Sequence, residues 1–290
     1  MAQSIFLAGS APSTPGAGYV SLYAKTDKLF YAMDDAGNEN VLSATISAYS
    51  TSGLIVNPNT GTPASQIDIS AGNIVDSTGA YLFQGTAMTK DLSLTWAAGT
   101  GNGGYYTSGG LPISSTIHVF AIRKDSDGSI DYYADTSVSA ANIPTGYTAY
   151  RRIHSFRTDG SGNIVLYTAT EISGGGVKTT PSVPTGDYSG AGSIPSRAAL
   201  VLSVPLGIQV EATLFLIRTG STGGFLLVTE STQADSTPSA TTGDVYSDSG
   251  VSLGCTEVNR ITDTSGRVYH RQSAAATVYI ATKSWVDWRN

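Results

Sequence analysis

Hydrophobic and polar positions alternate over short runs along most of the chain, and turn-forming residues separate these runs. YVSLYA at 19–24 alternates in this way, and TIHVFAIRK at 116–124 and NIVLYTATE at 163–171 are runs rich in β-branched and aromatic residues. A period of two residues is typical of β-strands, whereas a period near 3.6 indicates an amphipathic helix. Long windows with the helical period are missing from the sequence. The pattern therefore predicts an all-β protein.

Segments rich in Gly, Pro, Ser and Thr divide the predicted strands into three groups. An N-terminal arm and a β-meander of three short strands take up 1–46, and a linker follows over 47–65. We expect a β-sandwich-like domain over 66–175, a Gly/Pro linker over 176–194 and a second small β domain over 195–290. Because an isolated hairpin is marginally stable in water, the meander needs copies of itself or a larger body to pack against.

Four similar turns lie between strand-like runs: DDAGN at 34–38, DSDGS at 125–129, TDGSGN at 158–163 and TDTSGR at 262–267. Asp and Asn hydrogen-bond their own backbone in turns, and Gly adopts positive φ without steric cost. The recurrence favours strand reversal over a ligand-binding loop. In TDGSGN we expect both Gly160 and Gly162 to be required by the backbone.

Two segments superficially suggest a bound ion. Asp125, Asp127 and Asp131 are spaced like calcium ligands, but the EF-hand pattern fails after them. A hairpin is favoured there, and a weakly bound cation stays open. GTGNGG at 99–104 resembles a phosphate loop but lacks the Lys-Ser/Thr pair and the helix that follow one. No cofactor or metal site is therefore assigned.

Composition excludes several classes of function. Charged residues make up 13% of the chain and the net charge is −6, whereas soluble domains contain about 25% charged residues. A nucleic-acid partner is not expected, because phosphate binding needs clustered Lys and Arg. A single cysteine excludes an intrachain disulfide. No run reaches the ~18 apolar residues of a membrane span, and no basic segment of a signal peptide opens the chain. We expect synthesis in a cytoplasm and no membrane insertion.

No motif indicates catalysis. The three histidines lie in strand-like runs, and neither a nucleophile elbow nor HExxH nor CxxC occurs. A spatially assembled triad or a carboxylate pair stays possible in principle, but no catalytic residue is assigned. Aromatic residues near loops and near the C-terminus are candidates for docking or surface contacts: Tyr105, Tyr106, Trp285 and Trp288.

Three segments resemble proteins of tailed-bacteriophage fibres. GYVSLYAKTDKLFYAMDDAGNENVL at 18–42 is similar to their N-terminal attachment segment, where Gly-x-x-x-Leu-Tyr-x-Lys leads to DDAG. IPTGYTAYRRIHSFRTDGSGNIVLY at 143–167 resembles a stretch in which Pro-x-Gly-Tyr leads to Arg-Arg-Ile. The ending after 262 is similar to theirs, although Ser284 replaces the Gly of a usual Gly-Trp-x-Asp-x-Arg, so we expect the last turn to differ.

The resemblance implies a non-enzymatic virion structural protein, made in the host cytoplasm and located in the virion. It implies a homotrimer attached through its N-terminal segment to other proteins of the tail, collar or capsid, with a host-surface glycan as a further partner. An alternative is a carbohydrate-binding or polysaccharide-degrading virion module, since β scaffolds host both. The expected attachment or oligomer contacts are Tyr19, Leu22, Tyr23, Leu29 and Tyr31.

Overall fold

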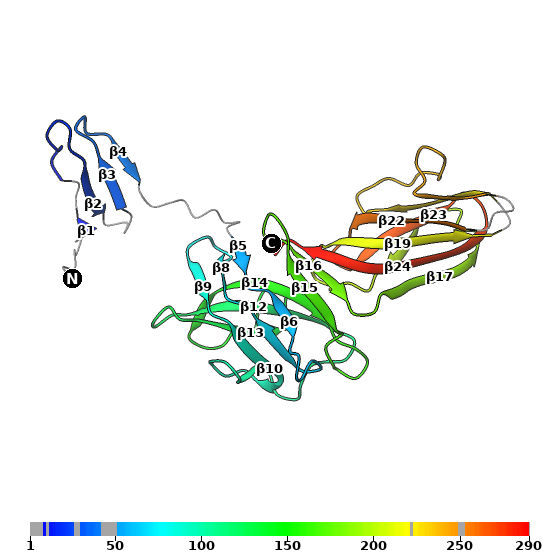
Figure 1. The fold of residues 1–290 in the computed structure, drawn as a ribbon, viewed down its shortest axis with the longest axis horizontal. Helices are drawn as coiled ribbons and strands as arrows, with labels where there is room; N and C mark the ends of the chain where they lie inside the picture. Colours follow the sequence, from blue (N-terminus) through cyan, green and yellow to red (C-terminus); the bar gives the residue numbers. More distant parts are fainter. Residues whose placement is uncertain are drawn as a thin grey trace. The chain divides into compact units, whose positions relative to one another are not determined.

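The computed structural model describes residues 8–9, 12–25, 30–41, 51–220, 223–248 and 253–289. Over these ranges every regular element is a β-strand, which confirms the predicted all-β class (Figure 1). In the same ranges no helix is long and apolar enough to cross a membrane. Contacts divide the chain into two compact units, 1–47 and 48–290.

The N-terminal unit is a four-stranded sheet in the order β1-β2-β3-β4. Its strands are Ala8–Gly9, Ser21–Lys25, Phe30–Met33 and Glu39–Val41. β2, β3 and β4 pair antiparallel, as a meander does, and β1 pairs with β2 in parallel. The three-stranded meander is thus found where the alternation predicted it.

The first part of the larger unit, which we call the middle lobe, holds two sheets. A seven-stranded sheet has the order β14-β12-β13-β11-β10-β7-β6, and a three-stranded sheet has the order β5-β8-β9. The strands are Thr51–Gly53, Val56–Pro58, Gln66–Ile69, Gly72–Val75, Leu82–Gly85, Met88–Thr95, Gly103–Tyr105, Thr116–Lys124, Ile130–Asp135 and Tyr147–Arg157, as β5 to β14.

The remainder, the C-terminal lobe, is also built from two sheets. The larger has the order β15-β16-β24-β19-β22, and β17 also pairs with β24; the smaller has the order β18-β23-β20-β21. The strands are Tyr167–Glu171, Val177–Pro181, Thr185–Gly192, Ala198–Val201, Glu211–Thr219, Gly224–Thr229, Val245–Ser247, Leu253–Ile261, Arg267–Gln272 and Ala276–Asp287, as β15 to β24.

The larger C-terminal sheet serves two hydrophobic cores. Its β15–β16 end contributes Tyr167, Ala169 and Val177 to the core of the middle lobe. β19 and β24 instead contribute Leu214 and Trp285 among others to the core of the C-terminal lobe. Because one sheet packs on both cores, the two lobes form a single compact unit.

The predicted linkers differ from the structure. The segment 47–65 contains β5 and β6, and the segment 176–194 contains β16 and β17. In β16 every second residue of VKTTP is buried, beginning with Val177, so the segment is a strand with an inward face. Its partner, β24, lies about a hundred residues further along the chain, and the local sequence does not reveal it.

Three of the four predicted turns share one geometry. The side chains of Asp34, Asp159 and Asp263 each accept hydrogen bonds from the backbone N–H groups two and four residues later. The Gly three residues after each Asp has φ between 69° and 84°. The turn at 125–129 differs, because Oδ1 of Asp127 accepts hydrogen bonds only from Ser129, from its backbone N–H and its hydroxyl group. The turns at 34–38 and 125–129 join strands that pair antiparallel, as predicted, whereas those at 158–163 and 262–267 connect strands of different sheets.

Candidate functional site

The three aspartates considered for a cation point to different partners. The carboxylate of Asp125 accepts from Thr148, that of Asp127 from Ser129, and that of Asp131 from the N–H of Gly99 at 2.7 Å. Across the described part of the chain, no group of three or more His, Cys, Asp or Glu side chains is placed to hold a metal ion. Their spacing in the sequence therefore does not become a shared site.

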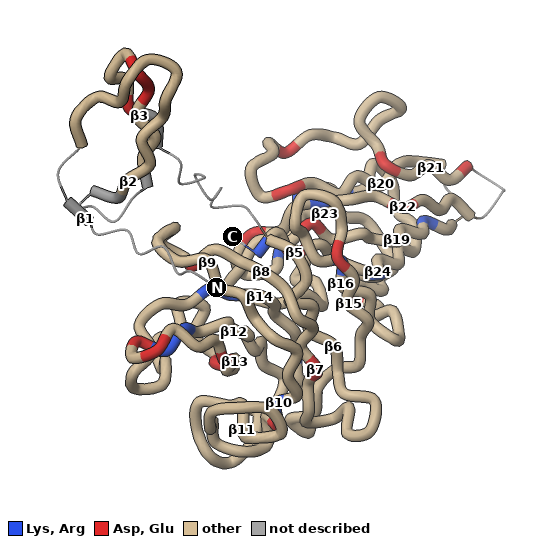
Figure 2. Tube along the Cα trace, turned by 60° about the vertical axis from the view of Figure 1, so that its left-hand side comes forward, with Lys and Arg blue, Asp and Glu red and all other residues tan. Residues whose placement is uncertain are grey.

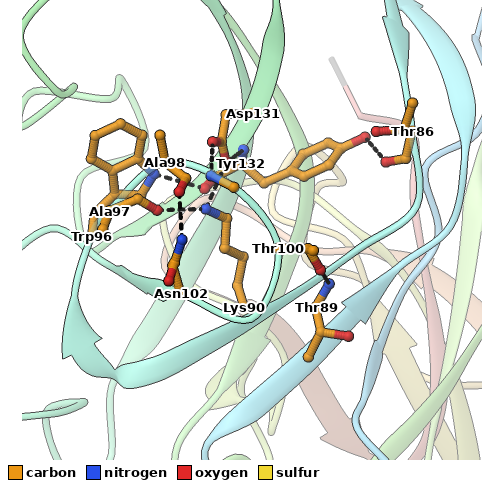
Figure 3. A network of polar contacts seen from close by, with 11 residues as sticks. Thr86, Thr89, Lys90, Trp96, Ala97, Ala98, Thr100, Asn102, Asp131 and Tyr132 are labelled. Carbon is orange, nitrogen blue, oxygen red and sulfur yellow. Dashed lines mark hydrogen bonds and ion pairs between the residues drawn. The ribbon is translucent and has the colours of Figure 1, made fainter.

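Asp131 belongs to a buried network in the middle lobe (Figure 3). Its Oδ1 lies 2.6 Å from the Nζ of Lys90, which also donates to the carbonyl of Ala97 at 2.8 Å. Burial lowers the pKa of Lys90, and the hydrogen bond and charge of Asp131 oppose that shift. The glycine-rich loop at 99–104 thus binds an internal carboxylate through Gly99, so its amide is occupied by the protein itself.

Two of the four candidate surface aromatics lie in a core. Tyr105 is buried in the middle-lobe core and Trp285 in the C-terminal core, so both predictions of surface contact are wrong. Tyr106 is half-buried with its ring 4.7 Å from that of Tyr105. Only Trp288 is well exposed, at 42%. Tyr105 ends β11, all three residues of which are buried, and Trp285 lies at a buried position of β24, whereas Tyr106 and Trp288 lie just beyond these strands.

The expected attachment residues differ in their exposure to solvent. Tyr19 and Leu22 are 72% and 54% exposed, whereas Tyr23 is buried, stacks on Tyr31 and donates its hydroxyl hydrogen bond to Glu39. Tyr23 therefore stabilises the N-terminal unit from within. Leu29 lies outside the described residues.

Two of the recognised sequence segments meet at the junction between the lobes. Arg152 of the Arg-Arg-Ile stretch forms a two-pronged salt bridge with Asp287 near the C-terminus, one bond of which, from Nη2 to Oδ1, measures 3.0 Å. Both side chains are almost fully buried. Burial raises the pKa of Asp287, but Arg152 and the N–H of Arg289 outweigh this, and the net effect is a lowered pKa.

Arg289 forms hydrogen bonds with residues of several separate segments. Its guanidinium donates to the carbonyls of Gly175 and Gly53, both at 2.8 Å, and lies 3.3 Å from Glu171. Arg151 donates to the carbonyl of Arg289 at 2.7 Å. Blue and red segments accordingly lie together beside the C-terminus, and a second such group lies at the turn between β12 and β13 (Figure 2). We call residues 287–289 with these partners the C-terminal clasp.

Ser284 lies within β24 beside a bulge, so its segment is a strand where a turn was expected.

A hydrogen-bonded path leads from the clasp into the middle lobe. Arg152 donates to Ser155 Oγ at 3.2 Å, and that oxygen lies 2.8 Å from Nδ1 of His118. Burial and the charge of Arg152 lower the pKa of His118 to about 4, so it is neutral at pH 7. Ser155 is fully buried. A serine inaccessible to substrate and held by Arg152 is a structural group and not a nucleophile.

A groove of about 440 Å³ opens above the salt bridge at the lobe junction. Val138, Arg152, Asp287 and Trp288 line it together with a wall from the C-terminal lobe: Gly207, Ile208, Gln209, Val210, Glu211, Ile261 and Thr264. A second hollow of about 400 Å³ shares Val138 and Gly207 with it and is lined by Ser114, Ser115, Thr116, His118, Thr136 and Leu206. We call the two hollows together the junction groove.

Several buried polar atoms of the 48–290 unit have no hydrogen-bond partner among the described residues. They include both ring nitrogens of His154, the hydroxyl of Tyr167 and Nε1 of Trp285. Burial lowers the pKa of His154 to about 4, with the neighbouring Arg152 adding to the shift and Asp287 opposing it. The apolar interior between β14 and the larger C-terminal sheet thus contains a neutral histidine whose ring nitrogens have no hydrogen-bond partner among the described residues.

Comparison of the chain with protein-family models, with curated proteins and with solved structures found no match.

Sequence reasoning missed the junction groove because its walls come from distant segments. Val138 and Glu211 are unremarkable in their local context, and Trp288 was predicted as a docking aromatic without the residues that surround it. The signals available were the quoted Arg-Arg-Ile stretch and the Trp-x-Asp-x-Arg ending, each noted separately. Complementary charges in two such segments would have suggested their pairing.

Proposed function

We propose that the protein is a non-enzymatic structural component of a bacteriophage virion, similar to a tail fibre, attached to the particle through its N-terminal unit. It assembles with itself, most simply as a homotrimer, and contacts other virion proteins of the tail, collar or capsid. The observation that carries the proposal is the separate unit at 1–47 with exposed apolar side chains.

The N-terminal sheet has the properties of an attachment element. Its strands are two to five residues long, and none of its residues joins the three hydrophobic clusters found among the described residues. Tyr19, Val20 and Leu22 are all more than half exposed. Contiguous exposed apolar residues mark interaction surfaces, and a small sheet gains stability by covering them. Copies of the same unit around a threefold axis, or a virion partner, would bury this face.

The 48–290 unit suits a protein that must persist outside a cell without disulfides. Its two lobes share a sheet, and the buried Arg289 donates hydrogen bonds to the carbonyls of Gly53 and Gly175. Buried hydrogen bonds between separate segments stabilise the folded unit.

Particle incorporation tests the proposal. Particles assembled with the full chain should contain it after purification, and particles assembled with a chain lacking residues 1–47 should not. The double variant Tyr19→Ser, Leu22→Ser should lower incorporation at least tenfold, whereas Val183→Ser, at a 76% exposed position of the other unit, should leave it unchanged. Full incorporation of the deletion would contradict attachment through this unit, and absence of the full chain from purified particles would contradict the virion assignment.

A further inference from the structure

We propose that the side chains of Lys90 and Asp131 condense to an amide, so that a covalent cross-link joins β10 to β13 within the middle lobe (Figure 3). The inference goes beyond the proposed function, since it concerns the chemistry of one buried pair and holds whether or not the chain is part of a virion. An amine and a carboxyl group form this bond by losing water, and no oxidant or cofactor takes part.

The two reacting groups lie in contact and away from solvent. Nζ of Lys90 lies 2.6 Å from Oδ1 of Asp131, and the two side chains are 0% and 7% exposed. Groups that a fold holds together and orients can react as if at effective concentrations of about 10⁵–10⁸ M. Burial of the amine therefore excludes bulk water but keeps the carboxyl group within reach.

Burial also favours the uncharged, reactive form of Lys90. Desolvation lowers the pKa of its amine, although the hydrogen bond and the charge of Asp131 oppose the shift. Transfer of one proton from the ammonium to the carboxylate leaves two neutral groups, which cost less to bury than two charges. The resulting amine has the free electron pair that attack on a carboxyl carbon requires.

The hydrogen bonds around the pair give each oxygen of Asp131 a different role. Oδ2 accepts from the N–H of Gly99 at 2.7 Å, and this donor stabilises the negative charge that develops on Oδ2 when Nζ attacks Cγ. Oδ1 faces Nζ and receives its protons. The Nζ–Cγ bond forms, the Cγ–Oδ1 bond breaks, and two of the three ammonium protons leave with Oδ1 as water.

The surroundings match the polar groups of the product. Nζ donates to the carbonyl of Ala97 at 2.8 Å, and the single N–H of an amide nitrogen would keep this acceptor. The amide oxygen would keep the N–H of Gly99. An ammonium has three N–H groups, and besides Asp131 and Ala97 its contact among the described residues is the ring of Trp96, 5.5 Å from Nζ to the centroid. The cross-link thus leaves neither of its polar atoms without a partner.

Gly104 makes room for the Lys90 side chain between the two strands. β11 lies between β10 and β13 in the sheet, so the link has to pass across it. A Cβ added to Gly104, in β11, would lie 2.8 Å from the Cβ of Lys90. A covalent link between distant residues restricts the unfolded chain. It would stabilise the middle lobe of a protein whose single cysteine allows no intrachain disulfide.

Intact-mass spectrometry of the full chain, purified and then denatured, tests the inference. We expect the native chain to be lighter by one water than its sequence. Trypsin does not cleave after an acylated lysine, so digestion should yield a species that joins 29–123 to 125–151. A native chain with the full mass of its sequence would overturn the inference, and the pair would then be a buried salt bridge only.

Variants locate the lost water. Lys90→Arg and Asp131→Ala each remove one reacting group, and both should have the full mass of their sequences and lack the joined tryptic species. The control Lys124→Arg changes the lysine of an ion pair with Asp127 that is about half exposed, and it should keep the loss of one water. Loss of water in Lys90→Arg or Asp131→Ala would place the dehydration elsewhere, as at an Asp-Gly bond, and would overturn the assignment. If either variant fails to fold, the mass and the tryptic species of the native chain decide the matter.

Discussion

Asp287 is the residue on which the lobe junction depends most, because its carboxylate compensates the buried charge of Arg152. Removing one partner of a buried ion pair leaves an uncompensated charge, which costs about 3–5 kcal/mol. We therefore expect Asp287→Asn to lower the free energy of unfolding by several kcal/mol in urea denaturation. Glu257→Gln breaks an ion pair with Lys283 in which both side chains are about half exposed, and it should cost less than about 1 kcal/mol. Equal effects of the two variants would contradict the role of Asp287.

His154 makes stability depend on pH in a definite direction. Its folded pKa is lowered to about 4 by burial, as is that of His118, and that of His270 is also lowered. An unfolded histidine has a pKa of about 6.5. Between these values the unfolded chain binds protons that the folded chain does not. The folded state is therefore most stable above about pH 6.5 and loses stability as the pH falls towards about 4, by about 1.4 kcal/mol per pH unit for His154 and for His118.

His154→Phe isolates this contribution. Neither ring nitrogen of His154 has a hydrogen-bond partner among the described residues, and the ring packs against Tyr167 at 5.1 Å between centroids. Phe keeps the ring contact and removes the titrating group. Urea denaturation at several pH values between 7 and 4.5 gives the change in the free energy of unfolding per pH unit. For the variant, this slope should correspond to about one fewer proton taken up on unfolding than for the native chain. An unchanged slope would show that His154 does not titrate as its burial implies.

At the scale of elements, the two glycines of the turn at 158–163 differ in their backbone conformation, although the sequence suggested the same role for both. Gly162 has φ of 79°, and an added Cβ would lie 2.6 Å from the carbonyl oxygen of Leu111. At Gly160 φ is not positive and nothing lies within 4 Å of an added Cβ. The prediction that both glycines are required is therefore correct for Gly162 alone.

The pair provides a matched test. Gly162→Ala should lower the free energy of unfolding by about 1–2 kcal/mol for the left-handed backbone, with a further cost from the contact with Leu111. Gly160→Ala should change it by less than about 0.5 kcal/mol. Chemical denaturation of the two variants measures the difference, and a larger loss in Gly160→Ala would contradict the turn geometry.

The strands were predictable where an apolar, β-branched run was continuous and local. TIHVFAIRK at 116–124 is found as β12 with the same bounds, because such a run with a turn after it indicates a strand buried on both faces. The strand β16 was hidden by neighbouring glycines, and its pairing with β24 is a long-range property. The candidate site was hidden for the same reason, since Arg152 and Asp287 are 135 residues apart in sequence. Alternation fixes which residues point inward but not which distant strand they meet.

At the scale of the molecule, the C-terminal clasp couples the two lobes of the 48–290 unit. Arg289 joins β5, the turn before β16 and Glu171 of β15 through hydrogen bonds to three separate segments. Its own backbone has φ of 55°, which the hydrogen bond from its N–H to Asp287 stabilises. Deleting residues 288–290 removes these bonds but leaves the salt bridge between Arg152 and Asp287. The lobes should then remain folded but unfold less cooperatively.

Calorimetry and hydrogen exchange together measure this coupling. We expect the unfolding transition of the native 48–290 unit to broaden or split in the truncated chain, and the amides of β5 and β16 to exchange at least tenfold faster. The amides of β20 lie in the smaller C-terminal sheet, which does not include β24, so they should keep their native protection. Lys283→Ala, at a side chain 45% exposed on the same strand β24, is the control and should alter neither measurement. Native exchange at β5 and β16 in the truncated chain would mean that the shared sheet couples the lobes without the clasp, since that sheet survives the deletion intact.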